Sequence, residues 1–248
     1  MKKPVSLMYW TGFFLVLLLL WQLLARAVDN PLLLPDVQMV LSAMAGQLAS
    51  PQFVPVIAST IGRVLAATAL SLVTGILLAV VSLLCSRCAF FIDRFLLLIR
   101  SVPNISFIIL ALFWLDREAA VLMVLILLLM PLIYSSFYQR LKEISTEYRD
   151  LLQLYPQPFR VRFRDLYLPE LRGTFMAAVT SALSLAFKGG VMAEVLCQTG
   201  TGIGRTLQSS RFALDTAGVI GWTVWLLLVT FVIDGLFKLL QKYIADKL

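Results

Sequence analysis

The residues most able to do chemistry inside this chain lie in one apolar stretch, where Lys188 is followed by Gly189 and Gly190 and then by Glu194. On a helix, Lys188 and Glu194 are separated by about 120° around the axis and about 9 Å along it, so they do not form an ion pair between neighbouring turns. Each charge needs another partner or a wet cavity, because an ionised group at the centre of a bilayer costs about 3 kcal/mol or more.

Charged groups inside a membrane are functional candidates by default, so we expect these residues to line or brace a path for a solute. The alternative is that Lys188 snorkels to the membrane surface, or that Glu194 already lies at it.

The sequence gives little support for an enzyme. The chain has no histidine, which removes the commonest general base and metal ligand. Cys85 and Cys88 have redox or zinc spacing without a second half, so we interpret them as small apolar residues at a helix end. The glycine-rich residues 200–206 lack the spacing and the lysine of a phosphate-binding loop. We therefore expect no catalytic residue and no metal site, and we expect 198–215 to be a flexible external turn.

The composition indicates a membrane protein. Hydrophobic residues make up 60% of the chain and charged residues only 14%, with a mean hydropathy of +0.90. These values are typical of an all-α polytopic membrane protein. The net charge of +7 is then a sign of membrane topology, and we expect lipid rather than nucleic acid as a partner.

Apolar runs long enough to cross a bilayer, which takes about 20 residues, predict about six spans: 7–25, 64–85, a shorter one at 101–115 after Pro103, 118–137, 174–196 and 217–239. The first run could instead be a signal peptide, because Lys2 and Lys3 precede it and Ala25-Arg26-Ala27 ends it. It is longer than the usual signal core, so we favour a retained span.

Charge predicts the orientation. With both termini in the cytoplasm, most of the 21 basic residues fall on the cytoplasmic side, as the positive-inside rule requires. Five arginines then lie outside: Arg26, Arg63, Arg117, Arg205 and Arg211. We predict a single transmembrane domain over 1–248, in which 1–63 holds the first span and an external connector and 64–248 forms the core. In the connector, Asp36 should cap a short amphipathic helix ending near Leu48.

Residues 145–172 form the longest charged segment, and it must lie outside the hydrocarbon, most naturally in the cytoplasm. It also carries large apolar side chains that could fill a groove on a partner: Leu151, Leu152, Leu154, Tyr155 and Phe159. Its charged residues Asp150, Arg160 and Arg164 could set the orientation of that partner.

A repeating pattern of small residues lies in the second predicted span. Ala67, Ser71, Gly75 and Ala79 recur every four residues, so they share a helix face that lets another helix approach closely. That helix can belong to the same chain or to another subunit, and the sequence leaves both open.

Residues 150–169 resemble the cytoplasmic coupling loop of ABC-importer permeases. Asp150-Leu151-Leu152 occupies the Glu-Ala-Ala place of the family pattern, Pro156 the glycine place, and Leu168-Pro169 the closing pair. Other features are similar to the nitrate, sulfonate and taurine branch and to its relatives for thiamine-pyrimidine precursors: residues 31–36, 100–103, 187–194, Gly202-Ile203-Gly204 and Asp215.

The resemblance implies a type I importer permease in the bacterial inner membrane. Two copies would enclose a path, two separate ATPase subunits would grip the coupling loops, and an extracytoplasmic binding protein would deliver the solute. The chain has no Walker A motif, so ATP and Mg²⁺ would be bound by the partner. Lys188 would suit an anion, whereas Phe107, Phe113 and Trp114 would suit a flat ring. The rival hypothesis is a secondary transporter that works without an ATPase, although no internal repeat supports it.

Overall fold

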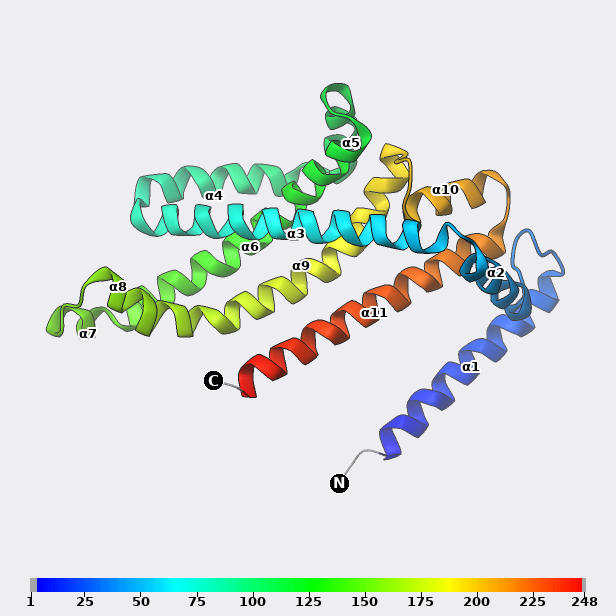
Figure 1. Ribbon diagram of the computed structural model, residues 1–248, viewed down its shortest axis with the longest axis horizontal. Helices are drawn as coiled ribbons and strands as arrows, with labels where there is room; N and C mark the ends of the chain where they lie inside the picture. The colour runs from blue at the N-terminus through cyan, green and yellow to red at the C-terminus, as the bar shows by residue number, and fades with distance from the viewer. Residues whose placement is uncertain (1–3, 247–248) are drawn as a thin grey trace.

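The computed structural model describes residues 4–246, and every regular element in that range is a helix. In chain order the elements are α1 (Pro4–Val28), α2 (Val37–Ala49), α3 (Phe53–Leu84), α4 (Ser86–Ser101), α5 (Asn104–Trp114), α6 (Arg117–Glu147), α7 (Arg149–Leu154), α8 (Phe159–Arg162), the π-helical turn η1 (Phe163–Tyr167), α9 (Leu168–Cys197), α10 (Ile203–Phe212) and α11 (Thr216–Asp246) (Figure 1). The predicted all-α polytopic fold is confirmed.

Within residues 4–246, four helical stretches are long and apolar enough to cross a membrane: Phe53–Leu84, Arg117–Glu147, Arg160–Cys197 and Thr216–Leu239. The pair α4 and α5 adds a fifth if it counts as one broken span. In α1 the described apolar part is Gly12–Val28, which is shorter.

The centre of the bundle is built by α3, α6 and α9 (Figure 1). Ala67, Ser71, Gly75 and Ala79 are all buried on one face of α3. A methyl group on Gly75 would come within 2.9 Å of the Ile133 side chain on α6. The small face is therefore used for packing inside the chain, which decides between the two alternatives.

The third span differs from its prediction. It begins with α4 at Ser86 rather than at residue 101, and α5 turns away from α4 by 97°. Pro103 explains the break, because a proline disfavours helical geometry in the residue before it and donates no amide. The sequence interpretation missed α4 because its charges suggested a cytoplasmic segment. In the structure α4 lies alongside α3.

The polar residues of α4 find partners on α6. Arg100 donates to the backbone oxygen of Pro131 and, at 2.8 Å, to Ser135 Oγ. Tyr134 donates its hydroxyl to Asp93 Oδ1 at 2.7 Å. These bonds allow a charged helix to pack against an apolar bundle.

Two further boundaries were wrong. The second span begins at Phe53, earlier than residue 64, and residues 203–212 form helix α10 where a flexible turn was expected. The glycines in that segment suggested flexibility, but the packing described below requires them. The short connector helix is confirmed as α2, where Asp36 Oδ1 accepts from the Met39 amide at 2.7 Å.

The interpretation of Cys85 and Cys88 as two separate small residues was also wrong. The two are joined by a disulfide at the turn between α3 and α4, with their Cα atoms 5.2 Å apart. They are three positions apart in the chain, and α4 begins between them, so the helical turn brings the side chains together.

The molecule has two distinct ends (Figure 1). Helices α7 and α8 lie at one end, and α2 and α10 lie at the other. The start of α1 and the end of α11 both point away from the α2 and α10 end. This arrangement suits termini on one side of the membrane; their cytoplasmic location and the division at residue 63 stay predictions.

Candidate functional site

The buried carboxylate of Glu194 organises the end of the bundle near α10. Its side chain is 1% exposed, and Arg63 on α3 donates from Nη1 to Oε1 at 2.6 Å. The other oxygen, Oε2, accepts from Thr60 Oγ1 at 3.1 Å. The prediction that Glu194 needs a partner is met by a residue of another helix.

Arg63 also reaches α6. Its Nε and Nη2 donate to the two carboxylate oxygens of Glu118 at 2.5 and 2.8 Å. This two-point geometry fixes the guanidinium plane between α3, α6 and α9. We call Arg63, Glu118 and Glu194, with Thr60, the outer ion network. Sequence analysis had assigned Arg63 to an outer loop, because it placed the start of the second span one residue too late to include it.

The same carboxylate holds α10 in place. Gly204 donates its amide to Glu194 Oε2 at 2.8 Å, and Ile203 donates its amide to Thr60 Oγ1 at 2.9 Å. Gly202 has a φ of +133°, and a methyl group there would meet Glu194 Oε2 at 2.6 Å. The Gly-Ile-Gly sequence is thus required by close contact between α10 and α9.

Lys188 lies on a different face of α9 from Glu194, so the structure does not bring these two charges together. It is exposed, and no described residue forms a hydrogen bond or ion pair with it. The neighbouring exposed or half-exposed positions include the small or polar Ala177, Ser181 and Ser184, together with the apolar Leu185, Met192 and Val195. On α11 the exposed positions are instead large and apolar, as Leu227, Phe231 and Leu236 show. We call Ala177, Ser181, Ser184, Lys188 and Met192 the polar stripe.

Gly189 and Gly190 let α9 approach its neighbours. A methyl group on Gly189 would meet Leu128 of α6 at 2.6 Å, and one on Gly190 would meet Val64 of α3 at 3.2 Å. The helix is continuous through both glycines. Their role in the structure is close packing beside Lys188.

Asp234 of α11 is an intramembrane acid that sequence analysis missed. Ser184 of the polar stripe donates to its Oδ2 at 3.4 Å, while its buried Oδ1 has no hydrogen-bond partner among the described residues. A single Asp in the long apolar run 217–239 was the signal that could have found it.

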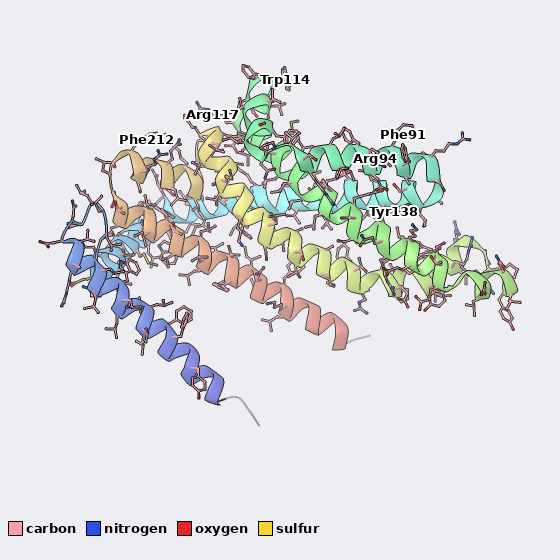
Figure 2. All side chains as sticks on the ribbon, turned by 180° about the vertical axis from the view of Figure 1, so that it is seen from behind. Phe91, Arg94, Trp114, Arg117, Tyr138 and Phe212 are labelled. Carbon is pink, nitrogen blue, oxygen red and sulfur yellow. A yellow bond between two sulfur atoms is a disulfide. The ribbon has the colours of Figure 1, made fainter. Side chains whose placement is uncertain are left out.

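Phe107 and Trp114 lie at one groove, at the bend between α4 and α5. Its volume is about 370 Å³, and its walls are apolar, with Phe95, Leu98 and Met123 among them. Figure 2 shows Trp114 projecting at the corner where α5 gives way to α6. Its side chain is 75% exposed.

The segment expected to couple to an ATPase is exposed. Among its apolar residues, Leu151, Leu154 and Tyr155 are exposed and Leu152 is half-buried. Its other expected contact residues are exposed as well: Asp150, Pro156, Arg160, Arg164 and Pro169. The side chain of Phe159 lies outside the described part of the structure.

This exposed segment is tied to the bundle through Glu170. Arg140 of α6 forms an ion pair with it, and Tyr148 donates its hydroxyl to Glu170 Oε1 at 3.3 Å. The negative charge of Glu170 raises the pKa of the Tyr148 phenol, which keeps the phenol a hydrogen-bond donor. These contacts join the end of α6 and Tyr148, the residue before α7, to the first turn of α9.

Comparison with known proteins decides the family. A family described as binding-protein-dependent transport system inner membrane component matches residues 71–246. The chain belongs to this family of permeases. Over 222 residues it is 25% identical to the formylaminopyrimidine transport permease protein ThiX of Halalkalibacterium halodurans, covering 88% of this chain and 87% of that protein. The predicted relationship to ABC-importer permeases is confirmed: the chain is a multi-pass inner-membrane transport component.

Proposed function

We propose that two copies of this chain enclose the path of an ATP-driven importer for a small nitrogen heterocycle. A separate ATPase supplies the energy and binds ATP and Mg²⁺, and an extracytoplasmic binding protein delivers the solute. Membership of the binding-protein-dependent permease family supports both partners.

The groove at Phe107 and Trp114 is the reason for choosing a flat heterocycle as the solute. Flat rings stack favourably on aromatic side chains, and a groove of about 370 Å³ suits a single ring. The relative named as a formylaminopyrimidine permease supports the same class of solute. A pyrimidine would move past this groove on its way between the two copies.

A second candidate solute is a small anion such as a sulfonate, nitrate or taurine. The polar stripe favours it, because Lys188 is exposed without a partner among the described residues. A lysine facing lipid would be costly, so the polar stripe suits the path or the second copy better than the bilayer. Asp234, beside Ser184, would lie next to the same path.

Uptake into vesicles tests the choice. Vesicles containing the permease and its ATPase, supplied with the binding protein and ATP, are compared for uptake of labelled formylaminopyrimidine and taurine. We expect Phe107→Ala and Trp114→Ala to lower pyrimidine uptake about two- to tenfold, the factor for an aromatic contact of about 0.5–1.5 kcal/mol. Phe231→Ala is the matched control, since Phe231 is an exposed aromatic on α11, away from the groove.

The opposite uptake result would identify the anion as the solute. Taurine uptake that falls in Lys188→Met, together with normal transport in both groove variants, would reject the heterocycle. Full, coupled transport of both solutes by Lys188→Met would show that Lys188 serves neither path, and would support snorkelling.

A further inference from the structure

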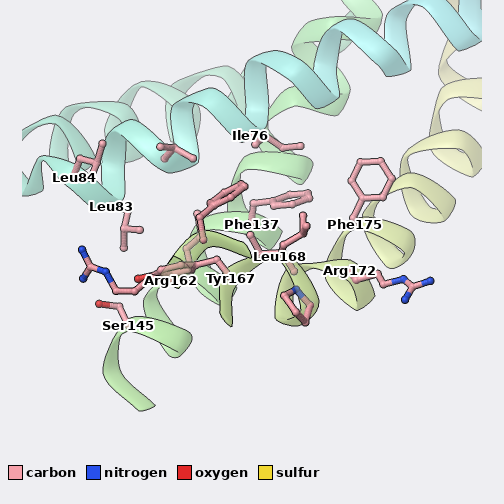
Figure 3. A pocket seen from close by; sticks show the side chains of 15 residues that line it. Ile76, Leu83, Leu84, Phe137, Ser145, Arg162, Tyr167, Leu168, Arg172 and Phe175 are labelled. Carbon is pink, nitrogen blue, oxygen red and sulfur yellow. The ribbon is translucent and has the colours of Figure 1, made fainter. Parts of the chain in front are cut away.

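A large cavity lies where α3, α6 and the start of α9 meet, next to the exposed coupling segment (Figure 3). Its volume is about 820 Å³. The walls are almost wholly apolar and include Leu83 of α3, Phe137 of α6, and Tyr167 and Phe175 from η1 and α9. Three membrane helices thus surround a space that none of their side chains fills.

The cavity is partly open where α3 ends. Leu84, the last residue of α3, lines it and is 76% exposed. Because this opening adjoins the end of a membrane-spanning helix, an apolar chain of a surrounding lipid could enter there. The volume lies within the range of about 300–1,000 Å³ that is usual for ligand sites.

The rim is basic. Arg162 and Arg172 both line the cavity, and Figure 3 shows their guanidinium groups at its two sides. The Nε of Arg162 is buried and has no hydrogen-bond partner among the described residues. A buried donor of this kind normally has an acceptor, and a phosphate oxygen is a strong one for a guanidinium.

We propose that this cavity holds one anionic phospholipid of the surrounding leaflet, with an acyl chain between α3, α6 and α9 and the phosphate at Arg162 Nε. The apolar walls match the chain, and the basic rim matches the headgroup. Basic pockets between transmembrane helices are a recurrent setting for anionic headgroups. The proposal needs only that the chain lies in a membrane, and it is independent of the solute and of the ATPase.

The lipid would join elements that otherwise only border the cavity. It would fill the space between the end of α3 and the first turns of α9, beside the contacts that Arg140 and Tyr148 make with Glu170. The composition of the leaflet would then affect how firmly the coupling segment is held against the bundle.

Native mass spectrometry of the full-length permease tests this. Delipidated protein in detergent is titrated with palmitoyl-oleoyl phosphatidylglycerol or with the phosphatidylcholine of the same chains. We expect one tightly bound phosphatidylglycerol, favoured over phosphatidylcholine by about fivefold or more, the factor for one basic residue at a lipid surface. Arg162→Gln should remove this preference.

Two variants separate charge from shape. Arg164→Gln removes the same charge two residues away, where the side chain is 85% exposed and does not line the cavity, and it should keep the preference. Val80→Trp fills the cavity from α3 and should weaken both lipids together. If Arg162→Gln fails to fold, Val80→Trp still decides whether the tight site is this cavity.

Several outcomes would overturn the proposal. Equal binding of the two lipids, or a preference that survives Arg162→Gln, would show that no anionic headgroup is held there. Displacement of the lipid by excess inorganic phosphate would reassign the rim to a free anion. Displacement by the ATPase subunit would assign the cavity to that protein.

Discussion

At the residue scale, we expect the stability of the α10 end of the bundle to depend on one arginine. Arg63 is the cation that compensates Glu194, whose side chain is 1% exposed, whereas its other partner Glu118 is 49% exposed. A buried carboxylate that loses its counter-ion keeps its desolvation cost and loses the attraction that offset it. A half-exposed carboxylate is solvated and screened, so its loss costs far less.

We therefore predict a large difference between two substitutions in the outer ion network. Arg63→Ala should lower the free energy of unfolding by about 3–5 kcal/mol, because it leaves Glu194 buried and uncompensated. Glu118→Gln should cost about 1 kcal/mol or less. Thermal unfolding of the two variants in detergent measures this, and equal losses would show that Glu194 is not the buried centre of the network.

At the scale of elements, α10 is positioned by contact as well as by hydrogen bonds. A methyl group on Gly204 would lie 2.5 Å from Glu194 Cβ and 2.6 Å from the Val191 backbone oxygen, so α10 would have to move. Gly200, in the same connection, has no atom within 4 Å of such a methyl group. The two glycines form a matched pair.

Gly204→Ala should destabilise the protein by about 1–3 kcal/mol, as overpacking against a backbone does. Gly200→Ala should leave stability within about 0.5 kcal/mol. Protease cleavage within 198–215 reads the displacement of α10, and faster cleavage in Gly200→Ala than in Gly204→Ala would contradict the packing described for α10.

The coupling segment carries the second prediction at this scale. Replacing Leu151 and Leu152 with Asp should strip the ATPase from the membrane complex while the permease stays folded, because apolar anchors in the contact become charged. Gln157→Asp is the control, since it adds a charge to the same exposed segment without removing an apolar group. Co-purification of the ATPase at the wild-type ratio with the double variant would disprove the docking role.

Local pattern predicted some elements well and others poorly, for identifiable reasons. The runs 118–137, 174–196 and 217–239 lie inside α6, α9 and α11, because apolar residues dominate them and charged residues are few. Helix α4 was missed because the partners of two of its charged residues, Asp93 and Arg100, lie on α6, which is far away in the sequence. Helix α10 was missed because its glycines serve contact rather than flexibility.

The residues of the candidate site could likewise be predicted only in part from the sequence. Glu194 could be selected as an unusual charge in an apolar run, but its partner Arg63 lies on another helix and 131 positions away. Phe107, Phe113 and Trp114 were chosen for their ring chemistry, and the structure places Phe107 and Trp114 on one groove but not Phe113. Asp234 was overlooked although the same reasoning applied to it.

At the scale of the whole molecule, we expect two copies of the chain to form the transporter. One coupling segment and one polar stripe per chain suit a symmetric pair, and two-fold symmetry is the commonest form of such assemblies. Mass measurement of the solubilised complex should give two permease chains and two ATPase chains. Cysteine pairs placed between residues 198–215 and the binding protein should crosslink, and a complex with one permease chain would contradict the paired path.

Dependence of uptake on the ATPase tests the central claim most directly. Vesicles with the permease alone and vesicles with permease and ATPase are supplied with the binding protein, labelled solute, ATP on the ATPase side and, separately, an ion gradient. We predict uptake only when permease, ATPase and ATP are together, with no response to the gradient. Gradient-driven uptake by the permease alone would contradict this account and identify a secondary transporter.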